Sequence, residues 1–261
     1  LDKVRTQLVE AFGGRFYEVV VGGAAFNSEI EQFLHKIGFP FTVGYGATEC
    51  APIITYADWK IAKPTSCGQA VPRMEVKIDS PDPENVVGQI LVSGANVMLG
   101  YYKNPEATAE VITPDGWFRT GDYGRLDEDG ELYITGRKKF LIILPNGENI
   151  FPETVESNIM ENLLYAHEVV AFEQKKIIGD KEIVVMAAAV YTEKSDHPED
   201  MSEEEIIKKV KADVAESNKG QPSYRKVQNV YVSFEEFPKS STRKVIRQKV
   251  IDTYTKETQN V

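Results

Sequence analysis

Hydrophobic residues in the first quarter of the chain follow two alternating patterns. Helical spacing of apolar residues covers Leu1–Phe12 and Asn27–Ile37, and compact apolar runs occupy Phe16–Val21 and Phe41–Val43. Compact runs are typical of buried strands, and their alternation with helices is typical of βαβ units. We therefore predict an αβ segment with parallel strands over residues 1–62.

From about residue 63 the pattern changes to short alternating segments that are separated by glycine and proline. Strands are predicted at Glu75–Ile78, Gln89–Ser93 and Glu131–Thr135, and Asp127–Gly130 has the residues of a hairpin turn. We expect a small antiparallel sheet or a distorted β-barrel over residues 63–137.

After Arg137 the predicted elements are those of an α+β domain. Ser202 and Glu205 have the spacing of a capping box, which marks the start of a helix. Residues 138–261 are numerous enough for a core of their own, so we predict a separate domain. The predicted strands are Phe140–Leu144, Glu168–Phe172, Ile183–Tyr191 and Val227–Phe234, and the predicted helices are Pro152–Glu161, Ser202–Glu216 and Lys244–Tyr254.

The composition, 42% hydrophobic and 27% charged, is that of an ordinary soluble globular chain. The net charge of −10 argues against general nucleic-acid binding, because phosphate neutralisation requires a basic surface. The longest apolar run, Ile183–Tyr191, has nine residues, whereas a bilayer crossing needs about 20. Cys50 and Cys67 form no C-x-x-C pair, and no secretory signal pattern is present, so we predict reduced thiols and a cytoplasmic protein.

Standard nucleotide and calcium loops do not match this sequence. No G-x-x-x-x-G-K-[ST] motif occurs, and Gly44–Glu49 lacks the third glycine of a dinucleotide fingerprint. Aligning Gly130 with the glycine of a calcium loop puts Arg125 and Gly136 at positions that need carboxylates. We therefore interpret Asp127–Gly130 as a turn.

Other clusters have residues suited to chemistry, although each alone also fits a structural role. Gly22–Ala24 fits a tight turn after a strand. Gly44–Glu49 puts an aromatic ring, a hydroxyl and a carboxylate at a strand end, where open α/β sheets bind ligands. Thr120–Asp122 is interpreted as a short loop, and Gly136–Lys139 with Pro145–Ile150 fits a hinge followed by a hairpin.

Together, in this order and spacing, these clusters resemble the adenylate-forming superfamily, which includes acyl-CoA synthetases, peptide-synthetase adenylation domains and luciferases. The resemblance covers essentially the whole chain. It implies the C-terminal part of the family's large core at residues 1–137, followed by a mobile α+β domain at residues 138–261. Further segments with the family pattern are Gly88–Gly94, Gly100–Pro105, Gly116–Asp122 and Pro238–Lys244.

Several residues favour one branch of the family. Peptide-synthetase domains usually have Asn and Pro where this chain has Gly44 and Ala47, and their hinge residue is usually Asp, where this chain has Lys139. The Leu144–Ile150 loop looks like that of long-chain fatty acyl-CoA synthetases. The resemblance therefore implies ATP-dependent, AMP-forming ligation of a fatty acid to coenzyme A through an acyl-adenylate. The alternatives are a ligase for an aryl or medium-chain acid, and a truncated, non-catalytic nucleotide-binding or scaffold protein.

The resemblance also assigns residues to the binding of ATP or AMP and of Mg²⁺. It implies that Tyr45 stacks on adenine, and that Thr48 reaches the α-phosphate. Glu49 would hold Mg²⁺, a hard cation that prefers carboxylate oxygen. Asp122 would accept hydrogen bonds from both ribose hydroxyls, and Arg137 would lie close to the same sugar. The backbone around the nucleotide would be that of Gly22, Gly23, Ala24, Gly44 and Gly46.

The remaining assignments belong to the domain change and the second reaction step. Lys244 matches the lysine that bridges carboxylate and α-phosphate oxygens during adenylation, although Arg243 stands where the family commonly has glycine. Lys139 matches the hinge about which the small domain rotates before CoA attacks. Gly147 would let the backbone pass close to pantetheine.

The family's Ser/Thr/Gly-rich phosphate loop lies upstream of the Gly22 position in full-length members and is not found in this sequence. We therefore expect a fragment with an incomplete active site, which is completed by the N-terminal remainder of the same protein. The sequence leaves peripheral membrane contact open. His35, His167 and His197 have no partners at ligand spacing, so structural roles are expected for them.

Overall fold

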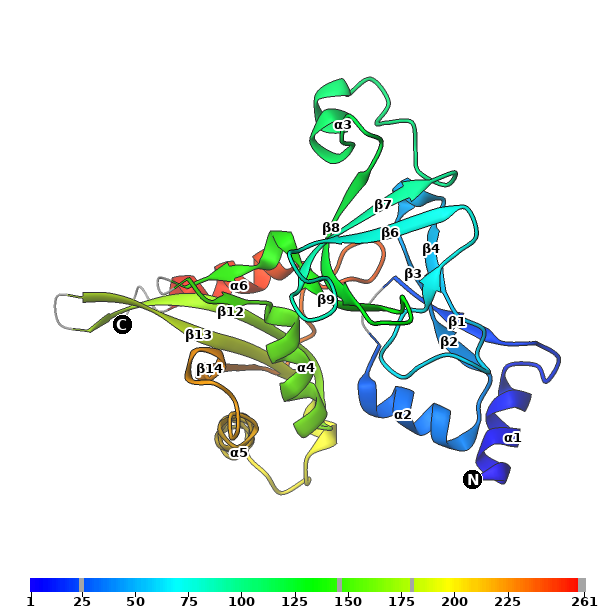
Figure 1. Cartoon of the computed structure of the whole chain (residues 1–261). Helices are drawn as coiled ribbons and strands as arrows, with labels where there is room; N and C mark the ends of the chain where they lie inside the picture. Colours follow the sequence, from blue (N-terminus) through cyan, green and yellow to red (C-terminus); the bar gives the residue numbers. More distant parts are fainter. Residues whose placement is uncertain (24–25, 145–146, 179–180, 258–261) are drawn as a thin grey trace. The chain divides into compact units, whose positions relative to one another are not determined.

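The computed structural model describes residues 1–23, 26–144, 147–178 and 181–257 (Figure 1). The chain divides into two compact units, Leu1–Lys139 and Phe140–Val261, which are called unit 1 and unit 2 and are considered separately.

Unit 1 begins with an αβ segment. Its elements are α1 (Asp2–Ala11), β1 (Val19–Val21), α2 (Ser28–Ile37) and β2 (Phe41–Val43). Strands β1 and β2 are parallel, as predicted, and their register sets Val21 beside Val43. The Asn27 side chain accepts a hydrogen bond from the Ile30 amide at 3.0 Å and so caps α2. Because β1 and β2 end together, the two loops that follow them meet at one edge of the sheet.

The rest of unit 1 is antiparallel. It contains β3 (Tyr45–Gly46), a 3₁₀ turn (Thr48–Cys50), β4 (Ile53–Tyr56), β5 (Gln69–Ala70), β6 (Met74–Asp79), β7 (Gly88–Gly94), α3 (Pro105–Val111), β8 (Phe118–Leu126) and β9 (Leu132–Arg137). The strands form one sheet of order β3-β4-β5 and another of order β6-β7-β8-β9. The antiparallel prediction is confirmed, whereas the structure does not show the barrel. The hydrophobic pattern did not predict β3, β4, β5, β8 or α3.

The expectation that Thr120–Asp122 is a loop is wrong, because this segment lies within β8. Gly121 has a φ of 75°, and the pairing of β8 shifts register toward both of its neighbours. Such irregularities interrupt the two-residue alternation that identifies a strand in a sequence. Asp127–Gly130, as predicted, turns the chain from β8 into β9, with the Gly130 amide donating to the Asp127 carbonyl at 2.9 Å.

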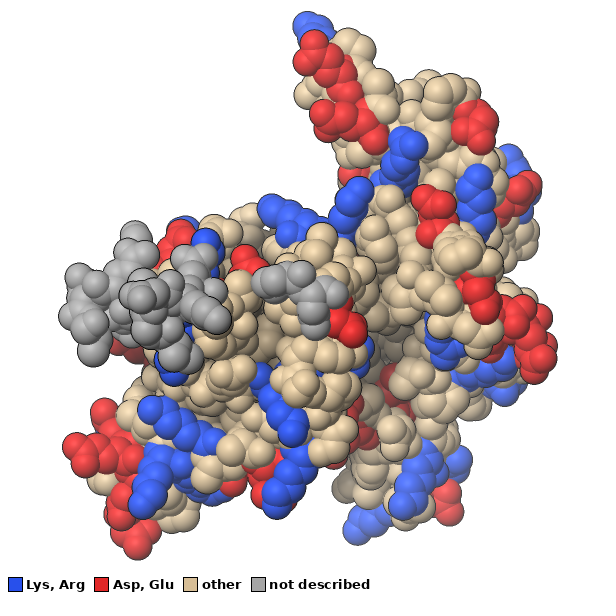
Figure 2. Space-filling view, turned by 60° about the vertical axis from the view of Figure 1, so that its left-hand side comes forward, with Lys and Arg blue, Asp and Glu red and all other residues tan. Residues whose placement is uncertain are grey.

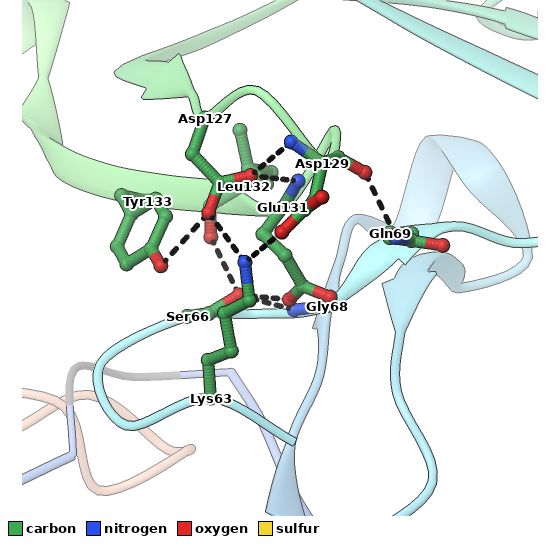
Figure 3. Close-up of polar contacts among 9 residues, drawn as sticks. All are labelled: Lys63, Ser66, Gly68, Gln69, Asp127, Asp129, Glu131, Leu132 and Tyr133. Atoms are coloured by element: carbon green, nitrogen blue, oxygen red, sulfur yellow. Dashed lines mark hydrogen bonds and ion pairs between the residues drawn. The ribbon is translucent and has the colours of Figure 1, made fainter. Parts of the chain in front are cut away.

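Polar contacts fix the segment before β5 onto this hairpin (Figure 3). Lys63 Nζ lies 2.9 Å from Asp127 Oδ2 and 2.6 Å from Asp129 Oδ2. The Ser66 hydroxyl donates to Glu131 Oε2 at 2.5 Å, and both of these side chains are buried. The carboxylates of Asp127 and Asp129 are therefore paired with Lys63, and the hairpin end is tied to the preceding segment by polar contacts.

Unit 2 is an α+β domain. Beyond a 3₁₀ turn at the unit boundary (Lys138–Phe140), its elements are β10 (Ile142–Ile143), β11 (Asn149–Ile150), α4 (Pro152–Asn162), β12 (Ala166–Ile178), β13 (Lys181–Thr192), a 3₁₀ turn (Lys194–Asp196), α5 (Glu203–Ser217), a further 3₁₀ turn (Ser223–Arg225), β14 (Val227–Ser233) and α6 (Arg247–Glu257). Strand β13 is central in its sheet, with β12 antiparallel on one side and β14 parallel on the other. The predicted capping box of Ser202 and Glu205 is present at α5.

Both faces of the unit 2 sheet are buried, which explains the uninterrupted apolar run in β13. Met186, Ala188 and Val190 face a core that includes buried residues of α4 and α5. Their neighbours Ala187 and Ala189 face a second core, to which α6 contributes. Successive side chains of a strand point to opposite faces, so a strand covered on both faces needs apolar residues at every position. Figure 1 shows these helices around the sheet.

Three elements predicted for unit 2 have other bounds in the structure. The strand expected at Glu168–Phe172 extends from Ala166 to Ile178. The strand expected at Phe140–Leu144 is limited to Ile142–Ile143, because the preceding residues form a 3₁₀ turn. The last helix begins at Arg247, because Val245 instead forms an isolated antiparallel bridge with Lys239. Lys244 therefore lies in a turn before the helix.

Charged side chains of both signs lie on the surface between larger areas of other residues (Figure 2). On the face shown in Figure 2, the basic and acidic residues that the structure describes are interspersed. Within the same described ranges, no helix is long and apolar enough to cross a membrane.

Candidate active site

The backbones of two predicted glycine loops lie against each other beyond β1 and β2. The Gly44 amide donates to the Val21 carbonyl at 2.9 Å. A Cβ at Gly22 would lie 3.1 Å from the Gly44 carbonyl oxygen, and Gly23 has a φ of 87°. Ala24 lies outside the described residues. The structure thus brings Gly22, Gly23 and Gly44 together at the carboxyl ends of parallel strands, where α/β sheets bind ligands.

Gly46, two residues after Gly44, permits a tight reversal of the chain. A Cβ at Gly46 would lie 2.2 Å from the Pro52 carbonyl oxygen, a distance that no side chain tolerates. The Ala47 amide donates to the same carbonyl at 2.9 Å. This reversal holds the 3₁₀ turn of Thr48 and Glu49 beside β3, with Thr48 exposed to solvent.

Tyr45, Asp122 and Arg137 form a polar group although they are far apart in the sequence. The Tyr45 hydroxyl donates to Asp122 Oδ2 at 2.6 Å, and Arg137 Nε lies 2.9 Å from Asp122 Oδ1. Asp122 and Arg137 are paired residues of β8 and β9, so sheet register sets their contact. The Thr120 hydroxyl accepts from the Asp122 amide at 3.1 Å and donates to the Ile90 carbonyl at 2.9 Å, which fixes the backbone here.

Burial differs sharply within this group. The side chain of Asp122 is 7% exposed, whereas that of Arg137 is 63% exposed. Tyr45 is buried, and this burial raises the pKa of its phenol above the ordinary value, with the charge of Asp122 adding to the effect. The phenol therefore remains a hydrogen-bond donor to the carboxylate, while the guanidinium faces solvent.

Glu49 is held by a segment that the sequence assignments left out. Its carbonyl accepts from the Met98 amide at 2.7 Å. Its Oε1 accepts from the Tyr101 hydroxyl at 2.9 Å. The signal in the sequence was the Gly100–Pro105 segment, which matched the family pattern without an assigned role.

In unit 2, Lys244 is exposed on a compact turn that is closed by the bridge between Lys239 and Val245. The Ser240 amide donates to the Lys244 carbonyl at 2.8 Å, and the Arg243 amide donates to the Ser240 carbonyl at 2.9 Å. Arg243 has a φ of 63°, the left-handed conformation that favours glycine. At this position an arginine therefore occupies a strained backbone conformation that glycine would adopt without strain.

The predicted hinge residue, Lys139, and the predicted pantetheine-contacting residue, Gly147, lie on either side of the unit boundary. Lys139 is the last residue of unit 1 and belongs to the 3₁₀ turn at the boundary. Gly147 has a φ of 84° and donates its amide to the Leu144 carbonyl at 2.9 Å, in the connection between β10 and β11. Pro145 and Asn146 of this loop lie outside the described residues.

Sequence spacing gave no partners for the histidines, and the structure shows that His167 has partners in space. Its Nε2 lies 2.6 Å from Asp196 Oδ2, and Glu193 completes a group whose ligand atoms lie within 4.8 Å of one another. Pairing of β12 with β13 creates this proximity, which sequence spacing does not reveal. All three side chains are exposed, and an ion pair with a capping box accounts for their contacts. His197 is buried and hydrogen-bonded to Thr192 at 2.9 Å.

Two family models match the chain, and together they span most of it. The model described as AMP-binding enzyme matches residues 3–102, and the model described as AMP-binding enzyme C-terminal domain matches residues 140–261. This chain belongs to the adenylate-forming AMP-binding superfamily.

Curated members of this superfamily that match the chain are named for different acids. The long-chain-fatty-acid–CoA ligase FadD15 of Mycobacterium bovis is 35% identical over 176 residues, which cover 67% of this chain and 28% of the relative. The 4-coumarate–CoA ligase 2 of Narcissus pseudonarcissus is 31% identical over 261 residues, covering 95% of this chain and 43% of the relative. The chain thus spans less than half the length of these relatives.

The fold is that of other adenylate-forming enzymes. O-succinylbenzoate coenzyme A synthetase from Bacillus subtilis, in a complex with ATP and magnesium ion, superposes with a TM-score of 0.73 at 23% identity. The superposition covers 94% of this chain and 50% of that chain. The mixed α/β fold of this chain therefore corresponds to about half of such an enzyme.

Proposed function

We propose that the protein to which this chain belongs joins a long-chain fatty acid to coenzyme A, with ATP converted to AMP and pyrophosphate. The observation on which the proposal rests is the group of Tyr45, Asp122 and Arg137 in a unit whose glycine loops meet at strand ends. The resemblance of the Leu144–Ile150 loop and the 35% identity to FadD15 support the fatty acid as substrate. The relative named for 4-coumarate supports an aromatic acid as the second candidate.

In this proposal Asp122 binds the ribose of the nucleotide. Its oxygens already accept from Tyr45 and Arg137, but each oxygen of an ionised carboxylate has two lone-pair sites, so capacity for ribose hydroxyls remains. Because Arg137 is largely exposed, its guanidinium is free to turn toward the sugar. The Tyr45 ring would border adenine, with the backbone of Gly22 and Gly23 along its other side.

The turn of Thr48 and Glu49 fits a magnesium ion. Both side chains offer hard oxygen donors, and the Tyr101 hydroxyl occupies one oxygen of the Glu49 carboxylate, so the other can face a cation. Glu49 would hold the ion, which when bound supplies positive charge to the phosphates. The Thr48 hydroxyl would donate to an oxygen of the α-phosphate as the fatty-acid carboxylate attacks and pyrophosphate leaves.

Lys244 would supply the mobile positive charge of the adenylation step. Adenylation joins two anions, the fatty-acid carboxylate and the α-phosphate. A cation that contacts an oxygen of each therefore stabilises the transition state more than the separated reactants. A lysine on an exposed turn of a separate unit is suited to enter and leave the site. Lys139, at the unit boundary, would be the pivot, and the loop with Gly147 would approach pantetheine when the CoA thiol displaces AMP.

The test separates the two half-reactions in the whole protein. Lys244→Ala should lower palmitate-dependent ATP–pyrophosphate exchange at least ~100-fold, the scale of removing one preorganised transition-state partner. Transfer from pre-formed palmitoyl-adenylate to CoA should stay near the parental rate. Lys249→Ala, on the exposed side of α6, is the matched control and should change neither.

Equal losses in both half-reactions would overturn the role of Lys244. The choice of acid is tested in the same assay by comparing kcat/KM for palmitate, octanoate and 4-coumarate. A higher kcat/KM for 4-coumarate would overturn the fatty-acid substrate and favour the second candidate.

A further inference from the structure

Among the segments with the family pattern, Gly100–Pro105 received no residue role from the resemblance. In the structure the stretch from Met98 to Tyr101, which follows β7 and enters this segment, contacts both the backbone and the side chain of Glu49. Met98 binds the Glu49 carbonyl through its amide, at 2.7 Å. Tyr101 binds the Glu49 carboxylate through its hydroxyl, at 2.9 Å. Backbone and side chain of Glu49 are therefore both fixed by one short stretch of chain.

Tyr101 is itself held in place by α3. Its amide donates to the Thr108 hydroxyl at 2.9 Å, and that hydroxyl donates to the Asn104 carbonyl at 2.9 Å. The Asn104 side chain caps α3 by accepting from the Ala107 amide at 3.0 Å. Gly100 has a φ of 150°, and a Cβ there would lie 2.8 Å from the Thr108 side chain. These contacts hold the segment against α3, and they fix the backbone from which the Tyr101 side chain extends.

A phenol suits this position for a chemical reason. A lysine or arginine beside Glu49 would neutralise its charge and so compete with a cation, whereas a neutral hydroxyl orients the carboxylate and leaves the charge in place. A phenolic hydroxyl is uncharged and donates a hydrogen bond at neutral pH. One carboxylate oxygen is then occupied, and the other is set in a fixed direction.

We infer that Tyr101 is a positioning residue, which orients Glu49 for a divalent cation that accompanies ATP. This inference rests on the proposed function, in which Glu49 holds the cation. Groups that orient a metal ligand typically contribute 10–100-fold to metal affinity. Loss of the Tyr101 hydroxyl should therefore weaken cation binding without altering the contacts of the nucleotide with Asp122.

The adjacent tyrosine provides a matched control. Tyr102 is 87% exposed and Tyr101 is 36% exposed, and within the described residues the hydroxyl that contacts Glu49 is that of Tyr101. Tyr101→Phe and Tyr102→Phe each remove one phenolic oxygen from the same segment. The two variants differ only in which hydroxyl is lost.

The experiment uses the whole protein and Mn²⁺ as the probe. Free Mn²⁺ is measured by electron paramagnetic resonance in the presence of α,β-methylene-ATP. Tyr101→Phe should raise the dissociation constant of Mn²⁺ about 10-fold, and Tyr102→Phe should leave it at the parental value. In the exchange assay, Tyr101→Phe should need more Mg²⁺, and high Mg²⁺ should restore the parental rate.

Two results would overturn the inference. One is equal Mn²⁺ affinity for Tyr101→Phe and Tyr102→Phe. The other is a loss of exchange that high Mg²⁺ does not restore, which would indicate a general structural role. If Tyr101→Phe unfolds at a lower temperature, Thr108→Val takes its place, because it removes the hydroxyl that holds the Tyr101 backbone and should weaken Mn²⁺ binding in the same direction.

Glu49→Gln separates this inference from the proposed function. If Glu49→Gln binds Mn²⁺ as tightly as the parent, the assignment of Glu49 fails and the inference fails with it. If Glu49→Gln binds Mn²⁺ weakly and Tyr101→Phe binds it normally, the proposed function stands and only the role of Tyr101 is overturned.

Discussion

Each unit contains an ion pair between a largely buried carboxylate and an arginine, and the two pairs differ in the exposure of the arginine. In unit 1 the side chain of Arg137, the partner of Asp122, is 63% exposed. In unit 2 the side chain of Arg247, the partner of Glu156, is 13% exposed. The same pairing of residue types thus occurs at a surface in one unit and in an interior in the other.

The interior pair joins elements of the fold. Arg247 Nη1 lies 2.6 Å from Glu156 Oε1, and Arg247 Nη2 donates to the Ala171 carbonyl at 2.9 Å. The Ala171 amide donates to Glu156 Oε1 at 2.7 Å. These contacts connect α6 to α4 and β12. The pair therefore fixes the helix that follows the Lys244 turn.

The surface pair is suited to exchange partners. If Arg137 turned away, Asp122 would keep the buried hydroxyl of Tyr45 as a donor. Breaking a buried pair leaves an uncompensated charge in the interior, whereas breaking an exposed pair returns the cation to water. In the proposed function, exposure of the cation is the feature that separates the ligand-binding pair of unit 1 from the structural pair of unit 2.

Truncating the two arginines should give the largest difference between the pairs. Arg247→Met should lower the free energy of unfolding of unit 2 by about 3–5 kcal/mol above pH 7, because the buried Glu156 carboxylate loses its cation and the Ala171 carbonyl loses a donor. Arg137→Met should lower that of unit 1 by about 1 kcal/mol or less, because its guanidinium is already solvated and Asp122 keeps the Tyr45 hydroxyl as a donor. Urea unfolding, followed separately for the two units, measures both effects. Equal losses would remove the distinction between the two pairs.

The free energy of unfolding of unit 2 should depend on pH through the buried carboxylate of Glu156. Burial raises the pKa of Glu156 to about 7, because desolvation outweighs the attraction of Arg247. An acid whose pKa is raised on folding binds its proton more tightly in the folded state, so its contribution to stability falls as pH rises from about 4.5 to 7. The fall amounts to roughly 3 kcal/mol for this residue.

Glu156→Gln provides the control for this prediction, because other carboxylates also titrate in this range. We expect the difference in unfolding free energy between the parent and Glu156→Gln to change by that amount between pH 4.5 and 7. A parallel pH dependence of the two proteins would show that Glu156 titrates normally.

The smallest effect concerns the turn that leads into the helix of Arg247. Arg243→Gly should raise the free energy of unfolding by up to about 1.5 kcal/mol, because left-handed strain of about 1–2 kcal/mol is relieved while glycine costs about 0.5–1 kcal/mol of entropy. The ion pair of Arg243 with Glu236 is exposed, so its loss should matter little.

Lys249→Gly, in the first turn of α6, serves as the comparison for this turn. It should lower the free energy of unfolding by up to about 1 kcal/mol, because glycine is a poorer helix former than lysine. Thermal unfolding of both variants shows whether each change raises or lowers the free energy of unfolding. Destabilisation by Arg243→Gly would mean that its side chain contributes more than its backbone strain costs.

Local signals in the sequence were enough for much of the fold. Asn27 caps α2, and the capping box of Ser202 begins α5, because caps are contacts between residues three positions apart. The apolar run of β13 and the turn at Asp127–Gly130 are local in the same sense. Signals of this kind fail where the chain is irregular, as at Gly121 within β8 and at Arg243 before α6.

The order of the motifs also gave the family, since each motif is a short stretch that can be recognised without knowing what lies near it. The family models, which match residues 3–102 and 140–261, confirm that assignment. The roles assigned to individual residues, from Gly22 to Lys244, stay predictions.

Only the tertiary structure decided which side chains meet. Tyr45 reaches Asp122 across 77 positions, Tyr101 reaches Glu49 across 52, and Arg247 reaches Glu156 across 91. Such contacts depend on strand register and on where separate elements pack, and hydrophobic periodicity specifies only which face of an element is buried. Periodicity and local caps therefore determined part of the elements, whereas packing determined that one carboxylate lies with an exposed arginine and the other with a buried one.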